Sequence, residues 1–439
     1  MLDIKFIREN IDRVKASVIS KNLSGKVDVD LVLKLDDEMK ALSQEADVLR
    51  QEKNKIDSEM KKNPPEEDKK KLIASGTDIK NKLKVLEENL NLKQAELLEN
   101  MQKLPNVTSP KMPVGKNEDE NVSVRTWGEI PKFDFTPLDH VELGKRLKII
   151  DVEKTGDISG SRFYYFLNEA VLMQFGIIQL VFEALTNPAV LSELAKKVGS
   201  NSNKTFIPVI PPVMIKPEVM KQMDRLDPID ERYVLKNDDL VLVGSAEHTL
   251  GPLHMNEILD ESQLPIRYIG YSTAFRREAG SHGKDVRGIF RVHQFDKLEM
   301  ESFTTVEQGE LEQDFIVAIQ EYLVQQLELP YQVIQICTGD SGKPDYNQYD
   351  IECWMPSHNR YRETHTSDYM TDYQARRLNI KYKLKNGEKN FVHMNDATAF
   401  ALSRTMLAIV ENYQQKDGSV VVPKALRKYV GKDVITPKN

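Results

Sequence analysis

The chain has 439 residues, of which 40% are hydrophobic and 29% charged, and its formal net charge is -7. This length favours two or three domains, and the balance excludes a disordered or fibrous protein. The acidic charge does not indicate nucleic-acid binding, although it is compatible with a local basic face. The only cysteines, Cys337 and Cys353, exclude a disulfide framework and a cysteine-rich zinc site, so we expect no structural zinc.

No segment of the sequence resembles a signal peptide or a membrane span. The first residues, MLDIKFIREN, lack an apolar core, and no stretch approaches the roughly 18 apolar residues that a spanning helix needs. We therefore expect a cytoplasmic protein with no membrane partner.

Residues 1–106 are expected to form an N-terminal helical hairpin. Apolar residues recur at alternating spacings of four and three from Leu35 to Met60, and the pattern returns from Leu72 to Leu97. Pro64 and Pro65 lie between the two stretches and cannot continue a helix. Two apolar stripes of matching length predict an antiparallel coiled coil, with an arm about 40 Å long at 1.5 Å per residue.

The hairpin alone does not identify its role. A dimerisation or scaffolding coiled coil fits the pattern, and so does an element that reaches a large partner. Lysines surround the turn and suit phosphate contact, but lysine-rich tips are also commonly just solvated. These lysines are Lys61, Lys62, Lys69, Lys70 and Lys71.

Residues 107–121 are expected to be a linker and residues 122–439 a mixed α and β domain. A helix is predicted over 169–185 and another over 396–414, and residues 206–214 form a proline-bounded extended segment. The predicted strands cover 163–168, 241–247, 266–279, 288–303, 331–337 and 349–355, which together favour an antiparallel sheet. Neither a glycine fingerprint in a βαβ unit nor a P-loop is present, so a Rossmann fold is not expected.

A strand–loop–strand unit over residues 268–300 carries the richest chemistry. Alternation along the first strand places Arg276 and Glu278 on one face, and the loop from Gly280 to Gly288 follows. On the second strand Arg291, His293, Phe295, Lys297 and Glu299 share a face. Arginines that bind phosphate and a ring that stacks on a base suit a nucleotide. The plainer alternative is a solvated face with cross-strand ion pairs, but the density of these residues favours the nucleotide.

Two further segments complement this unit. The residues from Glu363 to Thr366 offer a carboxylate and hydroxyls, which are hard ligands suitable for Mg²⁺, although a surface acidic strand end would look the same. Arg404 lies among small and apolar residues and needs an anion. A structural carboxylate and a ligand phosphate would serve it equally.

The segment FRREAGSHGKDVRGIFRVHQFDKLE closely resembles motif 2 of the class II seryl-tRNA synthetases. The similarity extends over nearly the whole chain, including YRETHTSDYMTDYQARRLNIKY and SRTMLAIVENYQQKDGSVVVPKALRKYVG. The resemblance implies an α+β fold, with an antiparallel sheet flanked by helices and an N-terminal coiled-coil arm. It also implies a homodimer in which the arm binds the long variable arm of tRNA(Ser).

The resemblance implies a role for each matching residue. Arg276 and Arg404 would be catalytic, Phe295 would stack on adenine, and Glu363 with Thr366 would hold Mg²⁺. The implied ATP-binding residues are Arg276, Arg277, Glu278, Arg291, Phe295, Glu363, Thr364, His365, Thr366 and Arg404. The implied L-serine-binding residues are Ser245, Ala246, Glu247, Arg276, Glu299, Asp396 and Thr398.

The chain departs from the family pattern mainly around the amino acid. Ser245 replaces a threonine, and Asp396-Ala397-Thr398 replaces Asn-Gly-Ser, which adds a negative charge. KQMDRLDPIDERYVL stands where the family has GTGQLPKF, and Ser403 replaces the glycine before the last arginine. The phosphate-binding arginines and the metal carboxylate are retained, so we expect adenylation to be retained.

The resemblance therefore implies a serine–tRNA ligase that forms seryl-adenylate from L-serine and ATP and charges tRNA(Ser). It leaves open whether tRNA(Sec) is also charged. Two alternatives remain from other classes. An adenylating enzyme that loads a carrier protein would not need the long hairpin, and a silent paralogue used only for binding would not need the intact arginines and carboxylates.

Overall fold

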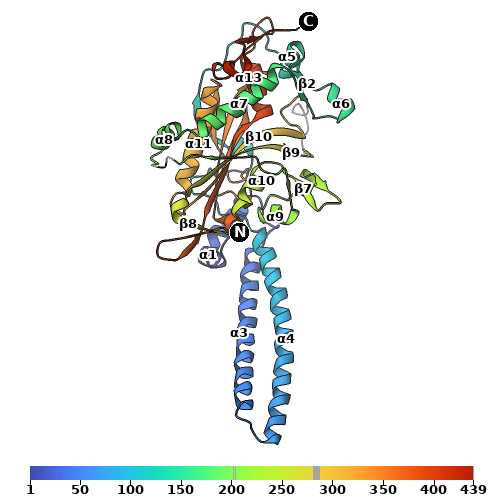
Figure 1. Ribbon diagram of the computed structural model, residues 1–439, viewed down its shortest axis with the longest axis vertical. Coiled ribbons are helices and arrows are strands. Elements are labelled where there is room, and N and C mark those ends of the chain that lie inside the picture. Colours follow the sequence, from blue (N-terminus) through green and yellow to red (C-terminus); the bar gives the residue numbers. More distant parts are fainter. Residues whose placement is uncertain (201, 203, 280–286, 439) are drawn as a thin grey trace. The chain divides into compact units, whose positions relative to one another are not determined.

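The structure is a computed structural model that describes residues 1–200, 202, 204–279 and 287–438. It divides into two compact units, Met1–Val107 and Thr108–Asn439 (Figure 1). The predicted boundary after residue 106 lies one residue from this division.

The first unit contains the predicted hairpin, which is confirmed. Two short helices, α1 (Ile4–Glu9) and α2 (Ile11–Ser20), precede the long helices α3 (Val29–Met60) and α4 (Glu66–Lys103). The long helices lie side by side in Figure 1 and are joined by a turn that contains Pro64 and Pro65. Ala46 of α3 and Leu83 of α4 belong to their shared apolar seam. The ion pairs Arg50–Glu87 at 3.0 Å and Lys93–Glu38 at 2.9 Å cross between the two helices.

The second unit is built on an eight-stranded sheet in the order β1-β11-β12-β13-β16-β10-β9-β4. Every pair of neighbours is antiparallel except β4 and β9, so the predicted α+β fold with an antiparallel sheet is confirmed. The strands are β1 (Val122–Trp127), β4 (Ile207–Val209), β9 (Ile266–Phe275), β10 (Gln294–Thr304), β11 (Tyr331–Gln335), β12 (Asn347–Met355), β13 (Arg360–Thr371) and β16 (His393–Ala401).

Helices cover one face of this sheet. The main apolar core combines α7 (Glu169–Leu185), α8 (Pro188–Lys197), α11 (Gly309–Gln326) and α13 (Leu402–Asn412) with the sheet residues Leu298, Met300, Ala397 and Ala399. Successive side chains of a strand point to opposite faces. The neighbours of these core residues, which include Lys297, Glu299, Asp396 and Thr398, therefore lie on the other face. The functional site is on that polar face.

Shorter elements surround the sheet. The remaining helices are α5 (His140–Leu147), α6 (Lys154–Ile158), α9 (Pro217–Gln222), α10 (Glu247–Leu250), α12 (Tyr373–Leu378) and α14 (Arg427–Val430). The remaining strands are β2 (Ile150–Asp151), β3 (Tyr165–Phe166), β5 (Met214–Ile215), β6 (Val234–Leu235), β7 (Leu240–Leu242), β8 (Ile258–Asp260), β14 (Lys381–Lys383), β15 (Lys389–Phe391), β17 (Val420–Val421) and β18 (Val434–Ile435). The 3-10 turns are η1 (Glu118–Glu120), η2 (Ile229–Glu231), η3 (Gly251–His254), η4 (Glu261–Gln263), η6 (Pro356–His358) and η7 (Lys424–Leu426).

The helix predicted over 396–414 is wrong in its first part. Residues up to Ala401 belong to β16, and α13 begins only at Leu402. In β16 the polar side chains of Asp396 and Thr398 alternate with Ala397 and Ala399, which is the period of a strand between β10 and β13. The small apolar residues of this segment suit both structures, and the neighbouring strands decide between them.

Several predicted strands are shorter in the structure, and the one expected over 163–168 is limited to β3. The strand expected over 241–247 is limited to β7, because Glu247 already begins α10. The strand expected over 266–279 ends at Phe275, and its partner begins at Gln294. Most of the predicted loop between Gly280 and Gly288 lies outside the described residues.

Residues 108–121, which were expected to be a linker, belong to the second unit. The Ser109 N–H donates to the Tyr346 carbonyl at 2.8 Å, and the Cys337 N–H donates to Asn121 Oδ1 at 2.8 Å. In the described part of the chain, no single helix is long and apolar enough to cross a membrane. Helices α7 and α8 meet the length and composition criteria only together, and they are bent by 73°.

Glu169 links the start of α7 to the C-terminal segment. Its carboxylate accepts hydrogen bonds from Lys432 Nζ and Lys438 Nζ, both at 2.6 Å, and its side chain is 7% exposed. Burial alone would raise the pKa of this carboxyl, but the two ammonium groups outweigh that effect and lower the pKa to about 2. The folded state therefore favours the ionised carboxylate.

The variant Glu169→Gln tests this link. Because the folded-state pKa is depressed, Glu169 contributes stability above its unfolded-state pKa, and that stability is lost as the pH falls toward about 2. We expect the variant to lose about 2 kcal/mol of unfolding free energy at pH 7 and clearly less at pH 3. Urea denaturation at the two pH values measures the difference. An equal loss at both would contradict the ion-pair explanation.

Candidate active site

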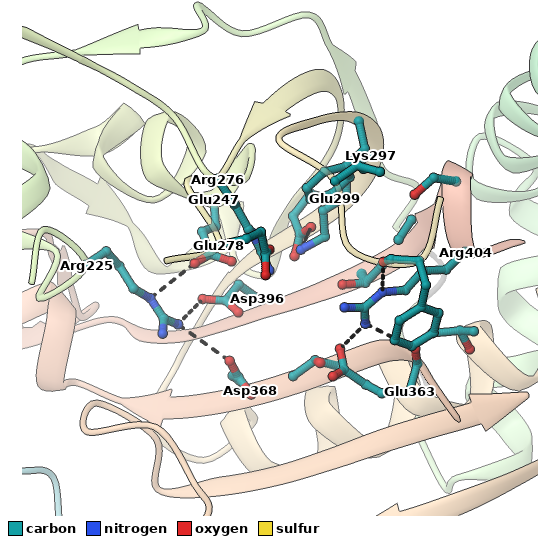
Figure 2. Close-up of a pocket in the computed structure, with 18 residues that line it drawn as sticks. Arg225, Glu247, Arg276, Glu278, Lys297, Glu299, Glu363, Asp368, Asp396 and Arg404 are labelled. Atoms are coloured by element: carbon teal, nitrogen blue, oxygen red, sulfur yellow. Dashed lines mark hydrogen bonds and ion pairs between the residues drawn. The ribbon is translucent and has the colours of Figure 1, made fainter. Parts of the chain in front are cut away.

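A cavity of about 180 Å³ lies on the polar face of the sheet. Strands β10, β13 and β16 form its floor, and the start of α13 and the segments around residues 225, 247 and 276 form its walls (Figure 2). Most of the residues expected from sequence to bind ligands line it. They are Glu247, Arg276, Glu278, Phe295, Glu299, Glu363, Thr364, Thr366, Asp396, Thr398 and Arg404.

Five expected residues do not line this cavity. Ser245 and Ala246 are buried behind it, Arg277 is exposed, and Arg291 lines two adjoining cavities. His365 points to the helix-covered face, where its ring centroid lies 5.1 Å from that of Phe400. Burial lowers the pKa of His365 to about 3, so the ring is neutral. An irregularity in β13 explains this placement, because the pairing with β12 shifts register between Glu363 and His365, and Glu363 and Thr366 can then both line the cavity while His365 faces the core.

Arginines and aromatic rings form one end of the cavity. Arg404 Nη1 donates to Glu363 Oε1 at 2.8 Å, and its guanidinium lies 4.6 Å from the Phe290 ring centroid. The Arg276 guanidinium lies 5.3 Å from the Phe295 ring centroid. Both groups can bind phosphate while they contact an aromatic face. The sequence left open whether Arg404 pairs with a carboxylate of the protein or with a ligand phosphate. In this structure its partner is the Glu363 carboxylate.

Arg276 is fixed close to the opposite end as well. Its Nε donates to the Gly244 carbonyl at 3.0 Å, next to Ser245 in the chain. Its own backbone is held by His293, whose carbonyl accepts from the Arg276 N–H at 3.0 Å. These contacts place the guanidinium between the two ends of the cavity, where it can contact two groups of one ligand.

Oxygen atoms gather beside Glu363. Asp350 lies opposite Thr366 in the pairing of β12 with β13, and its buried Oδ1 has no hydrogen-bond partner among the described residues. Burial and the charge of Glu363 raise the pKa of Asp350 well above its usual value. Desolvation beside the sheet raises the pKa of the half-exposed Glu363 carboxyl, but Arg404 and Arg276 outweigh this effect and lower it. Two crowded carboxylates and a hydroxyl fit the ligand preference of Mg²⁺.

Carboxylates dominate the other end. Lys297 Nζ lies 2.5 Å from Glu299 Oε2 and donates to Ser245 Oγ at 3.1 Å, and the Ser245 hydroxyl donates to Glu299 at 3.2 Å. Burial raises the pKa of Glu299 to about 7, with Lys297 opposing this effect and Glu247 adding to it. Oxygen atoms of Glu247, Glu299 and Asp396 lie within 4.8 Å of one another. This arrangement suits a small cationic group such as an ammonium.

Sequence reasoning missed Arg225, which enters the carboxylate end from the segment after α9. Its Nε lies 3.2 Å from Glu247 Oε1, and its Nη2 lies 3.1 Å from Asp396 Oδ2. Two signals could have found it. Arg225 belongs to the KQMDRLDPIDERYVL stretch that departs from the family, and the extra charge of Asp396 requires a cation nearby.

Lys297→Met tests the electrostatics of the carboxylate end. Without the ammonium the pKa of Glu299 rises above about 7, so keeping the carboxylate ionised in the folded state costs more at high pH. We expect a loss of about 2 kcal/mol of stability at pH 8.5 and little loss at pH 5.5, where Glu299 is already protonated. Thermal unfolding at the two pH values checks the sign. A loss that is larger at pH 5.5 would contradict this view of the pair.

Comparison with known proteins places both units in one family. The seryl-tRNA synthetase N-terminal domain model matches residues 1–108, and the tRNA synthetase class II core domain (G, H, P, S and T) model matches residues 233–413. The serine–tRNA ligase of Dictyoglomus turgidum is 40% identical over 439 residues and is covered in full, as is this chain. That of Rubrobacter xylanophilus is 40% identical over 445 residues, with 100% of this chain and 99% of the relative covered.

Solved structures give the same result. The seryl-tRNA synthetase of Pyrococcus horikoshii complexed with ATP superposes with a TM-score of 0.90 at 37% identity, and both chains are covered in full. The cytoplasmic serine–tRNA ligase of Naegleria fowleri in complex with AMP gives a TM-score of 0.85 at 31% identity, with 100% and 99% covered. The resemblance seen in the motifs is therefore confirmed along the whole chain.

Proposed function

The chain belongs to the seryl-tRNA synthetase family, and on that premise we propose that it is a serine–tRNA ligase, which forms seryl-adenylate from L-serine and ATP and transfers the seryl group to tRNA(Ser). The observation that carries this proposal is the polarity of the cavity. One end gathers carboxylates that suit an ammonium, and the other gathers arginines and rings that suit a nucleotide.

Arg276 occupies the position that the reaction needs. The serine carboxylate attacks the α-phosphorus in line, and negative charge develops on the oxygens around that phosphorus. A guanidinium between the two ends can bind the attacking carboxylate and the α-phosphate together, which positions them and neutralises their charge. Arg404 and Arg291 would hold the remaining phosphates, with Glu278 near the nucleotide and Phe295 against adenine. The step needs neither a general base nor a covalent enzyme intermediate.

Glu363 and Thr366 would hold Mg²⁺, with the orphaned Asp350 oxygen beside them. When bound, the ion would neutralise charge on the phosphates of ATP. In the absence of ligand, the Glu363 carboxylate holds Arg404 in place through the 2.8 Å hydrogen bond.

The carboxylate end would bind serine. Glu247 and Asp396 face the space suited to the ammonium, and Asp396 also offers an oxygen to the serine hydroxyl, together with Glu299 and Thr398. Ser245 acts from behind, since its hydroxyl bonds Glu299. A site that bonds a substrate hydroxyl rejects analogues that lack it, because its buried polar groups are then left unpaired.

The remaining assignments follow the family. Residues 1–106 would form the tRNA-binding arm and residues 122–439 the catalytic domain, with residues 107–121 as a linker that packs on the catalytic domain. The edge strand β1 is exposed along its whole length and carries Val122, Val124 and Trp127, which supports a homodimer through this edge. We propose that the enzyme works in the cytoplasm.

Arg276→Ala tests the reacting centre. We expect ATP–pyrophosphate exchange with serine and Mg²⁺ to fall at least about 1,000-fold, because the variant loses the cation that neutralises the developing charge. Chelation of Mg²⁺ should abolish exchange by the unchanged protein. Arg376→Ala is a matched control, since Arg376 pairs with Asp372 outside the cavity. Near-normal exchange in a folded Arg276→Ala variant would refute the assignment.

Removal of the arm tip separates the two half-reactions. Deletion of residues 51–81, closed by a short glycine linker, joins α3 to α4 where the helices already lie opposite each other. We expect exchange to stay within about threefold of the full chain, whereas tRNA(Ser) charging falls at least about 100-fold because phosphate contacts are lost. Charging at the normal rate would show that the arm does not bind tRNA.

A further inference from the structure

Arg225 is held at the carboxylate end by a rigid loop. Its carbonyl accepts hydrogen bonds from Arg232 Nε at 3.0 Å and Nη2 at 2.7 Å. The preceding Asp224 is bound by Lys343 Nζ at 2.8 Å and by the Tyr373 hydroxyl at 2.9 Å. The Arg225 N–H donates to the Met220 carbonyl at 3.1 Å, so the backbone on both sides of the Cα is held. The side chain, which is 16% exposed, extends into the cavity.

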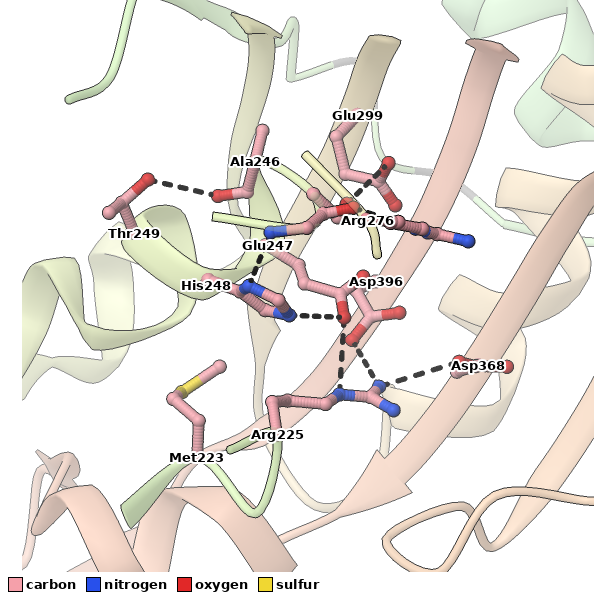
Figure 3. Close-up of polar contacts among 12 residues, drawn as sticks. Met223, Arg225, Ala246, Glu247, His248, Thr249, Arg276, Glu299, Asp368 and Asp396 are labelled. Carbon is pink, nitrogen blue, oxygen red and sulfur yellow. Dashed lines mark hydrogen bonds and ion pairs between the residues drawn. The ribbon is translucent and has the colours of Figure 1, made fainter. Parts of the chain in front are cut away.

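The guanidinium bridges carboxylates from three elements (Figure 3). It contacts Glu247 at 3.2 Å through Nε and Asp396 at 3.1 Å through Nη2. The same Nη2 lies 3.5 Å from Asp368. These partners belong to α10, β16 and β13 respectively, so one planar cation links the helix above the sheet to two strands of its floor.

The number of carboxylates makes this cation necessary. Six carboxylates, which are buried or nearly so, interact at this end in the described part of the chain: Glu247, Glu299, Glu301, Asp345, Asp368 and Asp396. Lys297 pairs with Glu299 and donates to Ser245. Negative charges at such short distances destabilise the folded site unless a counter-ion lies between them. Arg225 supplies that counter-ion for Glu247 and Asp396.

Asp396 and Arg225 belong together. Arg225 Nη2 donates to Asp396 Oδ2 at 3.1 Å, and Asp396 is 2% exposed, so the buried carboxyl has this guanidinium as a direct partner. We propose that Arg225 is a specificity-determining positioning residue, which holds Glu247 and Asp396 in the geometry that binds the ammonium and hydroxyl groups of the amino acid. This inference rests on the proposed function. Its consequence is that an acidic residue at position 396 is tolerated only with the arginine.

Kinetics of serine activation test the pair. Arg225→Met keeps the side-chain length and removes the charge, and we expect kcat/KM for serine to fall about 100-fold while KM for ATP changes less than about threefold. Preference for serine over alanine should fall at least about tenfold, because the acceptor for the hydroxyl is displaced. Arg225→Lys should be intermediate, since an ammonium cannot bridge two carboxylates as a planar fork does.

The double variant Arg225→Met/Asp396→Asn removes both charges. If Arg225 acts through Asp396, the double variant should recover at least about tenfold of the kcat/KM that Arg225→Met loses. Arg376→Leu serves as the matched control, because Arg376 pairs with Asp372 outside the cavity. Active-site titration and thermal unfolding of every variant show whether a change arises from loss of folded sites.

Three results would overturn the inference. If Arg225→Met keeps kcat/KM for serine within threefold of the unchanged protein, Arg225 does not position the amino-acid site. An equal fall in kcat/KM for serine and for ATP, with a smaller fraction of active sites by titration, would show that Arg225 has only a general structural role. A double variant with kcat/KM no higher than that of Arg225→Met would show that Arg225 does not act through Asp396. If the unchanged protein activates another amino acid instead of serine, the proposed function fails while the variants test Arg225 on that amino acid. If it activates none, both fail.

Discussion

Burial of carboxylates on one face of the antiparallel sheet is the constraint on which the site depends. Carboxylates in a cavity cost free energy unless cations and hydrogen bonds compensate them. The protein supplies Lys297 for Glu299 and Arg225 for Glu247 and Asp396. Burial and the neighbouring carboxylates still raise the pKa values of Glu301, Asp368 and Asp396 well above their usual range, so the site gains from a ligand that brings an ammonium. The same electrostatics explain why phosphates belong toward the opposite end, where Arg404 lies, with Arg276 between the two ends.

The sheet makes this separation possible. Leu298 and Met300 of β10 are fixed against the helices, and the alternation of the strand then places Lys297 and Glu299 in the cavity. A register shift of one residue would bury the charged set in the apolar core and expose the apolar set. The hydrophobic core therefore determines which side chains can bind substrate. Stability and function of the second unit are set by the same strand pairing.

The sequence predicts the periodic parts of this structure and misses the rest. The heptads of the arm and the alternation around Phe295 each define one face of one element. These local patterns are therefore enough to predict the helical hairpin and the polar face of the strand. The sequence pattern predicts a helix at the strand that carries Asp396, because the alanines of this segment suit both structures and only the neighbouring strands β10 and β13 distinguish them. Arg225 lies in an aperiodic loop, and its partners are far along the chain. Its role depends on tertiary contacts that no local pattern contains.

The orientation of the amino acid and the nucleotide in the cavity is the central claim. A crystal structure with a sulfamoyl analogue of seryl-adenylate, which cannot be hydrolysed to AMP, tests it most directly. We expect the ammonium of the ligand within hydrogen-bond distance of Glu247, its sulfamoyl group against Arg276, and its adenine on Phe295. A ligand bound in the reverse direction, or an ammonium that contacts none of the carboxylates around Arg225, would contradict this account.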